Sequence, residues 1–482
     1  MNSILRASVH NVHRTMSMPK QFKPARMNTN VFTRNKSAMQ DIPTDIDIDI
    51  DTSISTSAHK STHGALPPLP NIQNHFNPTP EHYQLRDLLT QFTREQIEPQ
   101  ALAYNKSETF NQPLFLQLEQ LGLLNLTVSD EYGGAGMDAT AVAIVHEELS
   151  YSDPAFCLSY LAHSILFGNN LAINGNSEQK KKWFVDREQG YIGGMCMSEP
   201  NAGTDVLGMQ TKATPILSED ADADADADAD ASGRDRGPGW ILNGQKMWIT
   251  NGTVDGKTTG DVYLVYAKTG EKRTDISQFI VEKNMEGFQL GQQIKDKLGM
   301  RASPTAELVF DNVFLPKENL VGEVNQGMLC MMRNLEIERV ALAAMAIGIA
   351  RRCIDEMVQY SSQRKAFGKQ ISDFGQIQQA IAVSYAEYMA GKSYLYTVTN
   401  SLDLKSHGNG LDADGVKLYT AGMSKNVADR AIQVMGGYGY VGEYQVERLW
   451  RDAKLLEIGG GTNESHHKNM VRDLKKAGHV LP

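Results

Sequence analysis

The chain has few cysteines and no long apolar run. Its four cysteines, Cys157, Cys196, Cys330 and Cys353, lie far apart in a sequence of 482 residues and form no C-x-x-C pair. This spacing argues against a disulfide scaffold and against a zinc or other metal site, and it is typical of a reducing compartment. The longest apolar run, Val340–Ala350, is shorter than the roughly 18 residues that a membrane-spanning helix needs, so we expect no membrane span.

Acidic residues are absent from the first 40 positions, although the whole chain carries a formal net charge of −10. Because residues 1–40 carry seven basic side chains, the rest of the chain carries −17. A basic, acid-free start resembles a transit peptide and predicts the mitochondrial matrix, although a disordered basic tail has the same composition. The acidic body disfavours nucleic acid as a partner.

Two segments have compositions too biased to build a core. Residues 41–77 alternate Asp with Ile and continue with Ser, Thr and Pro, which predicts a disordered linker. Residues 218–239 form an acidic low-complexity tract of repeated Asp and Ala, which we expect to be an exposed insertion in a hairpin loop. Neither segment indicates a function.

The rest of the chain changes its hydrophobic period twice. Residues 78–190 follow a helical period, residues 191–315 are short runs of period two, and residues 316–482 return to long helical runs. In the middle segment, Asn243-Gly244 and Asn251-Gly252 are typical hairpin turns. The predicted fold class is α+β, with an N-terminal α-helical domain, a middle β domain and a C-terminal four-helix bundle. The bundle helices are expected at residues 327–360, 373–401, 412–435 and from 464 onward.

Two carboxylates, Glu336 and Glu338, stand just before the longest apolar run. Helical residues two apart point about 200° apart, so we expect only one of them to face inward. Glu336 has Arg333 and Arg339 three residues to either side, which predicts a solvated, ion-paired side chain. Glu338 lies in the apolar stripe, where desolvation raises a carboxyl pKa and suits a general base. An interior glutamate paired with a distant arginine would give the same pattern.

Three further stretches have compositions suited to a ligand. Met195–Asp205, MCMSEPNAGTD, is rich in hydroxyl and backbone N–H groups. Gln245–Gly252 places Trp248 and Thr250 on one strand face, an aromatic plane beside a hydroxyl that suits a flat heterocycle. Glu457–Glu464 has three glycines before a helix, where backbone N–H groups can meet anionic oxygens. A core tryptophan, a turn and a capped helix start explain the same residues without a ligand.

Taken together and in this order, five motifs resemble the acyl-CoA dehydrogenase family over about residues 78–475. They are MSEPNAG with the following Asp205, WITNG, RKAFGK (Arg364–Lys369), QVMGGYGY (Gln433–Tyr440) and RDAKLLEIGGGT (Arg451–Thr462). The resemblance implies the three-domain fold described above, FAD as cofactor and an acyl-CoA substrate. It also implies a homotetramer that passes electrons to electron-transfer flavoprotein.

The resemblance also implies which residues bind FAD. Those expected to line or pack against the isoalloxazine ring are Met195, Met197, Ser198, Gly203, Thr204, Trp248, Ile249 and Thr250. Those expected around the adenosine and phosphates are Gln433, Val434, Met435, Gly436, Gly437, Thr462, Asn463 and Glu464. Arg364 matches an arginine that reaches the FAD pyrophosphate of a neighbouring subunit, so two chains would hold one FAD.

The family carries its catalytic base at one of two positions. Most members have it in the loop before the final Gly-Thr, which is Gly460 here, and glycine has no side chain to accept a proton. The isovaleryl-CoA and long-chain members have it on a bundle helix in the pattern L-x-L-E-R. Leu335–Arg339 fits that pattern and predicts Glu338 as the base, with the Gly460 N–H stabilising enolate charge. Other residues expected at the substrate site are Thr204, Glu336, Arg339, Leu342, Leu456 and Gly461.

The motifs most resemble the isovaleryl-CoA branch, which implies dehydrogenation of a short, branched acyl-CoA to the 2-enoyl-CoA. Leu456 and Leu329 replace tyrosines of that branch, Gly375 replaces a glutamine, and His466-His467 replace a basic pair. Another short- or longer-chain acyl-CoA is therefore an alternative substrate. Two further alternatives are an acyl-CoA oxidase, a class that usually has an extra C-terminal domain, and a catalytically silent scaffold member.

Overall fold

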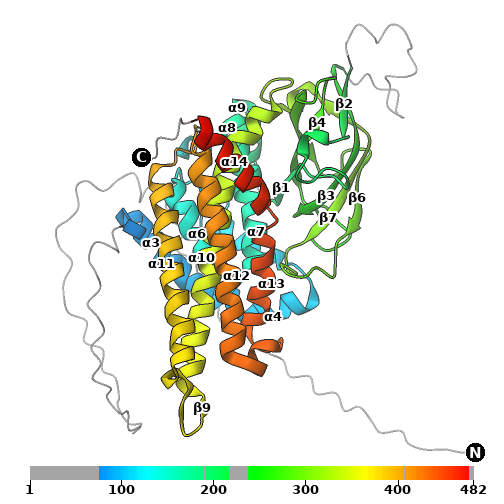
Figure 1. The fold of residues 1–482 in the computed structure, drawn as a ribbon. Helices are drawn as coiled ribbons and strands as arrows, with labels where there is room; N and C mark the ends of the chain where they lie inside the picture. The colour runs from blue at the N-terminus through cyan, green and yellow to red at the C-terminus, as the bar shows by residue number, and fades with distance from the viewer. Residues whose placement is uncertain (1–74, 188–189, 217–236, 407, 477–482) are drawn as a thin grey trace, which may run out of the picture.

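A computed structural model describes residues 75–187, 190–216, 237–406 and 408–476, which are the described residues below. The predicted transit peptide lies outside them, as do most of the predicted linker and of the acidic tract. Helices come first, a β domain lies in the middle of the chain, and long helices follow (Figure 1). This arrangement confirms the predicted α+β fold class.

The N-terminal helices begin at residues that cap them. Asp153 accepts hydrogen bonds from the backbone N–H groups of Ala155 and Phe156, and Pro154 is the first residue of α7. Asp138 caps α6 in the same way. The helices are α3 (Pro80–Phe92), α4 (Glu98–Ser107), α5 (Gln112–Gln120), α6 (Ala139–Ser152), α7 (Pro154–Leu161), α8 (Asn170–Asn174) and α9 (Ser177–Lys180), with π-helical turns between some of them.

The segment Pro154–Asn174 is one continuous apolar helix made of α7, a π-helical stretch and α8. Among the described residues it is the one helix whose length and composition would let it cross a membrane. Of its most apolar window, 78% is buried inside the protein. Its apolar surface is therefore covered by the neighbouring helices and strands.

The middle domain is an eight-stranded sheet in the order β6-β7-β3-β2-β4-β5-β8, with β1 paired to β4. Its strands are β1 (Gly193–Cys196), β2 (Lys212–Ile216), β3 (Gly239–Thr250), β4 (Val262–Lys268), β5 (Ile276–Glu282), β6 (Phe288–Gln293), β7 (Thr305–Pro316) and β8 (Leu320–Val321). Strands β2 and β3 flank the acidic tract and pair antiparallel, with Ile216 opposite Gly239.

Both predicted Asn-Gly hairpins in this domain are wrong. Asn243-Gly244 lies inside β3, where the register with β7 shifts between Leu242 and Gly244. Asn251-Gly252 does end β3, but β3 pairs with β2 and β7 and not with the strand that follows it. An Asn-Gly pair favours a positive φ, and a β-bulge uses that conformation as readily as a tight turn does.

The C-terminal domain has one more helix than predicted. The described helices are α10 (Gly327–Gln363), α11 (Gly375–Ser401), α12 (Gly410–Met435), α13 (Gln445–Leu456) and α14 (Asn463–Lys476). The prediction missed α13, which is short and lies between two glycine-containing segments. A small hairpin, β9 (Lys365–Ala366) and β10 (Lys369–Gln370), projects from the far end of the bundle (Figure 1).

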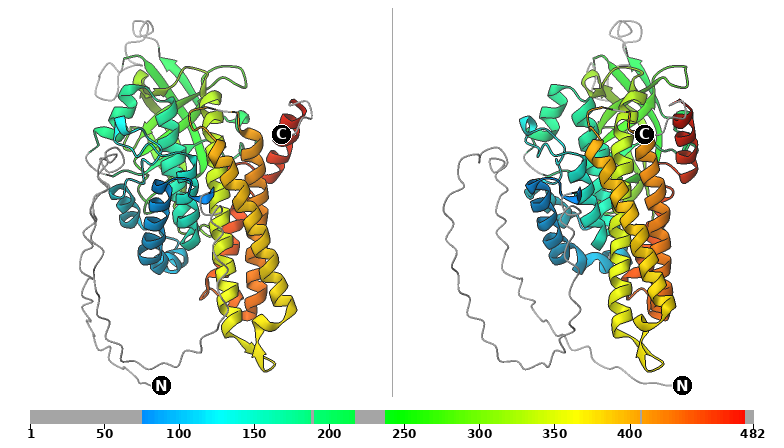
Figure 2. Two further views of the ribbon diagram at one scale, coloured as in Figure 1. Left: turned by 90° about the vertical axis from the view of Figure 1, so that its left-hand side faces the viewer. Right: turned by 60° about the vertical axis from the view of Figure 1, so that its left-hand side comes forward.

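Helix α10 is the centre of the molecule. It packs against α6 on one side and against α11, α12 and α13 on the others, as the two views of Figure 2 show for the long helices. Contact with α6 is close: a Cβ on Gly348 would lie 2.2 Å from the Ser150 hydroxyl oxygen. The run Val340–Ala350 is buried on all sides of the helix, which explains why it contains no charged residue.

Candidate active site

Glu338 on α10 is a buried carboxylate with no hydrogen-bond partner among the described residues. The residue is 8% exposed, and its Oε2 atom is buried and unpaired. Burial raises the pKa of Glu338 to about 7, and the nearby cations Arg339 and Lys417 oppose this shift. An ionisable group with these properties suits a general base that works near neutral pH.

Gly460 lies directly beside this carboxylate. A Cβ at Gly460 would lie 3.5 Å from Glu338 Oε1 and 2.2 Å from Leu342 Cδ1, and the Gly460 backbone has a φ of +65°. The two positions that the sequence resemblance gives for the base therefore meet at one place in the structure. With Glu338 and Leu342 present, that place leaves no room for a side chain at residue 460.

Glu336 is not the solvated, ion-paired residue that was predicted. It is also 8% exposed, and its two carboxylate oxygens accept hydrogen bonds from the N–H groups of Gly408 and Asn409, at 3.0 and 3.1 Å. Helix α12 begins at Gly410, so Glu336 caps its N-terminus. The prediction failed because it assumed that α10 has a solvent face.

The predicted arginine partners of Glu336 bind elsewhere. Arg333 Nη1 donates to Asn174 Oδ1 at 3.4 Å, and Arg339 Nη1 lies 3.0 Å from Asp414 Oδ1 on α12. Glu336, which was also predicted at the substrate site, is thus fully occupied in joining α10 to α12.

The first predicted flavin loop packs against α10 one turn before Glu338. Met195 and Met197 belong to an apolar cluster with Tyr266 of β4 and with Met331 and Leu335 of α10. The Tyr266 hydroxyl accepts hydrogen bonds from the side-chain amides of Asn170 and Gln278. Further along the loop, Gly203 and Thr204 are exposed. The loop therefore combines a buried apolar end with an accessible polar end.

A backbone hydrogen bond from Met247 N–H to the Ser198 carbonyl, at 2.9 Å, joins this loop to the second predicted stretch, Gln245–Gly252 at the end of β3. In this stretch, Trp248 has a φ of +67° and is 62% exposed, whereas Ile249 is buried and Thr250 half-buried. A register shift between Lys246 and Ile249 produces this arrangement. The bulge leaves the indole ring accessible, with the Thr250 side chain two residues further along the same strand.

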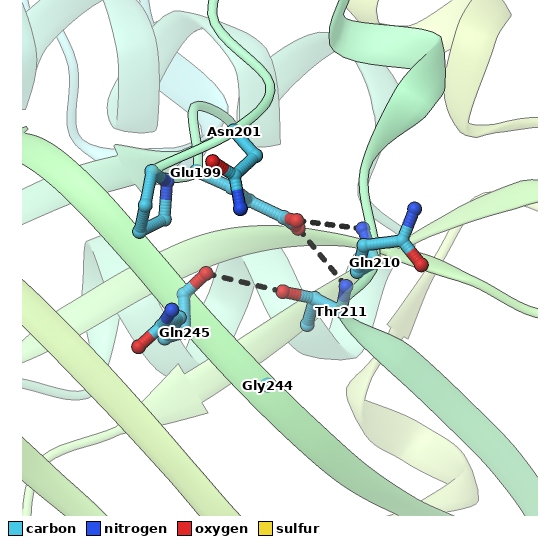
Figure 3. A pocket seen from close by; sticks show the side chains of 7 residues that line it. Glu199, Asn201, Gln210, Thr211, Gly244 and Gln245 are labelled. Atoms are coloured by element: carbon cyan, nitrogen blue, oxygen red, sulfur yellow. Dashed lines mark hydrogen bonds between the residues drawn. The ribbon is translucent and has the colours of Figure 1, made fainter.

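Just before this bulge, Lys246 is fully buried and forms an ion pair that the sequence interpretation missed. Lys246 Nζ lies 2.9 Å from Glu199 Oε1 and donates to the Met197 carbonyl at 3.1 Å. Glu199 also accepts from the N–H groups of Gln210 and Thr211, at 2.6 and 3.0 Å (Figure 3). This pair holds the middle of the first loop against β3. A lysine within a largely apolar strand was the sequence feature that could have indicated a buried ion pair.

A pocket of about 330 Å³ has the Glu199 member of this ion pair in its wall (Figure 3). Its lining residues are Glu199, Pro200, Asn201, Gln210, Thr211, Gly244 and Gln245. The carboxylate in its wall is already satisfied by Lys246 and two backbone N–H groups. The pocket therefore offers no free charge to a ligand, and we regard it as part of the loop's support.

The residues predicted around the adenosine and phosphates fall into two groups. The first group, Thr462, Asn463 and Glu464, lies at the start of α14. It is close to Lys417 on α12, since Lys417 Nζ donates a hydrogen bond of 2.6 Å to the carbonyl of the preceding residue, Gly461. Gln433–Gly437 lie at the other end of α12, about 24 Å further along at 1.5 Å per residue. Arg364 is exposed at the end of α10. One chain does not bring these groups together.

The remaining predicted residues differ in exposure. Val434 and Met435 are buried, whereas Gln433, Gly436 and Gly437 are exposed. Leu456 is fully buried in the main hydrophobic core, and Leu329 is half-buried. Asn463 has a buried Oδ1 without a partner.

These features fit a flavin. An accessible indole ring and a half-buried threonine lie two residues apart on one strand, and an apolar methionine cluster connects the Met195–Thr204 loop to the helix of Glu338. The unpaired, buried oxygens of Glu338 and Asn463 also need partners that the described residues do not supply. If FAD is held here, Trp248, Thr250 and the Met195–Thr204 loop would contact its ring.

The chain also matches known proteins in sequence and in fold. Three family profiles match the chain: acyl-CoA dehydrogenase N-terminal domain at residues 79–187, middle domain at 194–313 and C-terminal domain at 325–475. The mitochondrial isovaleryl-CoA dehydrogenase of Solanum tuberosum is 39% identical over 82% of this chain and 90% of its own length. A mitochondrial 2-methylacyl-CoA dehydrogenase of the same plant is 36% identical over 82% of this chain and 90% of its own length.

The fold has solved counterparts as well. Butyryl-CoA dehydrogenase from Megasphaera elsdenii superposes with a TM-score of 0.74 at 31% identity, covering 82% of this chain and 98% of that one. Matches of this extent in sequence and in fold cover all three domains. The chain therefore belongs to the acyl-CoA dehydrogenase family of flavin-dependent oxidoreductases.

Proposed function

We propose that this protein dehydrogenates a short, branched acyl-CoA to its 2-enoyl-CoA, with FAD as cofactor and Glu338 as the base that takes the α-proton. The observation that carries the proposal is the position of Glu338 Oε1 next to Gly460, at the start of a buried, apolar stretch of α10. A thioester α-proton is weakly acidic, so its removal requires a desolvated base and stabilisation of the enolate charge.

Each of these requirements has a candidate among the residues of this chain. Glu338 supplies the base, and its unpaired Oε2 is free to receive a proton. The backbone N–H of Gly460 is the candidate donor to the thioester carbonyl, and Leu342 excludes water from beside the carboxylate. When bound, FAD supplies the hydride acceptor for the β-hydrogen.

The proposed substrate class is supported by the relatives, whose names specify isovaleryl, 2-methylacyl and butyryl groups. The isovaleryl and butyryl groups are short, and the isovaleryl and 2-methylacyl groups are branched. Leu456 in place of a tyrosine favours a second candidate, a different or longer acyl chain. Leu456 is fully buried in the core, so this replacement would change the substrate site through packing.

We also propose a homotetramer in the mitochondrial matrix that passes its electrons to electron-transfer flavoprotein. The separation of the two predicted FAD-binding groups along α12 supports an oligomer, because a second chain would have to bring Gln433–Gly437 to a flavin held near Thr462. The basic start and the mitochondrial relatives support the compartment.

Anaerobic titration of the purified yellow protein tests the function. Isovaleryl-CoA is expected to bleach the visible flavin band, and a panel of straight and branched acyl-CoAs is expected to rank short branched chains highest. Slow reoxidation in air distinguishes a dehydrogenase from an oxidase, which would reoxidise rapidly. A protein that binds no flavin, or that no acyl-CoA bleaches, would refute the proposal.

The rate of bleaching is expected to depend on the ionisation of Glu338. Because its pKa is raised to about 7, the fraction of ionised base falls as pH is lowered through that value. The single-turnover rate should therefore rise with pH, tenfold per unit below about pH 6, and level off above about pH 8. Stopped-flow measurements from pH 5 to 9 check this; a rate that is constant down to pH 5 would contradict it.

A further inference from the structure

His466 on α14 is a fully buried histidine with one unpaired ring nitrogen. Its Nδ1 lies 2.6 Å from Asp414 Oδ1 on α12. A carboxylate accepts hydrogen bonds, so Nδ1 carries the proton of this pair. Nε2 is buried, and no residue in the part of the chain that the structure describes is its hydrogen-bond partner. Most buried polar atoms are paired, and this exception lies next to the glycine loop of the site.

The His466 ring lies against the backbone of Gly461. A Cβ at Gly461 would be 3.1 Å from His466 Cε1 and 3.3 Å from Nε2. The Gly461 carbonyl accepts a hydrogen bond of 2.6 Å from Lys417 Nζ on α12. The loop is thus in contact with side chains from two helices at one residue.

Asp414 connects these contacts to the helix of the base. Its Oδ1 atom lies 3.0 Å from Arg339 Nη1, and Arg339 directly follows Glu338 on α10. Asp414 and Lys417 are three residues apart and therefore share one face of α12. Asp414 and Lys417 are almost fully buried, as is His466. Helices α10, α12 and α14 are joined around the loop by this small polar cluster.

We propose that Asp414, His466 and Lys417 are positioning residues that hold the Gly460–Gly461 backbone at a fixed place beside Glu338. The inference rests on the proposed function, in which the Gly460 N–H stabilises enolate charge. A run of three glycines has more backbone freedom than any other sequence of that length, so it needs external contacts to stay in one conformation. A displacement of about 1 Å at such a donor costs roughly 100-fold in rate.

The variant His466→Phe tests the proposal, with His467→Phe as its matched control. His467 is the adjacent residue on α14 and is exposed. His466→Phe in the flavin-loaded enzyme is expected to lower kcat by about tenfold or more, with KM for acyl-CoA changed less than about threefold. His466→Asn, which keeps an amide N–H for Asp414, should recover most of kcat, and His467→Phe should match the wild type.

Hydrogen–deuterium exchange supplies a readout that does not depend on activity. Exchange in a peptide covering residues 457–465 should be faster in His466→Phe than in the wild type or in His467→Phe. Unchanged exchange in His466→Phe, or a kcat per bound flavin within twofold of the wild type, would overturn the proposal. If no acyl-CoA bleaches the wild type, the proposed function fails, and the exchange comparison still decides this inference.

Lys417→Met covers the case in which His466→Phe does not fold. The cations that act on Glu338 are Arg339 from α10 and Lys417 from α12, and Glu338 in turn helps to raise the pKa of the neighbouring Tyr266 on β4. Removing the Lys417 cation and its hydrogen bond should lower kcat and move the acid limb of the rate profile to higher pH. A Lys417→Met enzyme with the wild-type kcat and pH profile would overturn the proposal as well.

Discussion

Replacing Glu338 with glutamine is expected to slow flavin bleaching by acyl-CoA by roughly 10²–10⁴-fold while the protein keeps its FAD. Glutamine has nearly the volume of glutamate, so the packing of α10 against its neighbours is preserved. It cannot accept the α-proton, and Gly460 has no side chain to replace the lost base. Flavin content is measured from the visible spectrum, and the single-turnover rate by anaerobic stopped flow.

Glu336→Gln is the matched control for this experiment. Glu336 has the same exposure as Glu338 and lies two residues away on the same helix, but it binds the backbone N–H groups that begin α12. The glutamine oxygen still accepts one of these bonds, so the bleaching rate should stay near that of the wild type, with a small loss of stability. Equal losses of rate in both variants would show that the base has been assigned wrongly.

Replacing Glu147 with alanine is expected to give the largest loss of stability, roughly 3–5 kcal/mol. Glu147 on α6 is 0% exposed and lies within 3.4 Å of cationic atoms of Arg86, Arg351 and Lys392. The Tyr396 hydroxyl also donates to it at 2.6 Å. Burial opposes its ionisation, but the three cations hold the pKa of Glu147 well below its usual value. Without Glu147, these charges would stay buried with too few partners.

The melting temperature of the flavin-loaded protein measures this effect. Glu387→Ala is the control, because Glu387 on α11 pairs with Arg430 on α12 at 2.6 Å while both side chains are about one-third exposed. Loss of such a pair costs about 0–1 kcal/mol. A Glu147→Ala protein that melts no earlier than Glu387→Ala would mean that this buried cluster does not stabilise the junction of α3, α6, α10 and α11.

The burial of Glu336 and Glu338 could not be predicted from the sequence around them. Local periodicity separated Glu336 from Glu338 by assuming that a helix has one buried face. Helix α10 is covered by α6, α11, α12 and α13, so both are buried, and each has a different environment. What packs against a helix is a property of distant segments, and the pattern along the helix does not contain it.

Strand β3 illustrates the same limit. Asn243-Gly244 does mark a local irregularity of the backbone, but it is a bulge within the strand and not a hairpin turn. A second bulge leaves Trp248 accessible, whereas Lys246, just before that bulge, is buried and paired with Glu199. Strict alternation would have put Lys246 and Trp248 on one face, so the ion pair could not be found from spacing alone.

The sequence by itself determined the order of helical, β and helical domains, the family and the candidate base, because these depend on local periodicity and on motifs in a fixed order. Only the tertiary structure decided that Gly460 lies beside the Glu338 carboxylate, where a Cβ on residue 460 would be 3.5 Å from Oε1. It also decided that Glu336 caps α12, and that His466, Asp414 and Lys417 surround the glycine loop. These contacts join residues more than 40 positions apart, and their distances are set by helix packing rather than by any local pattern.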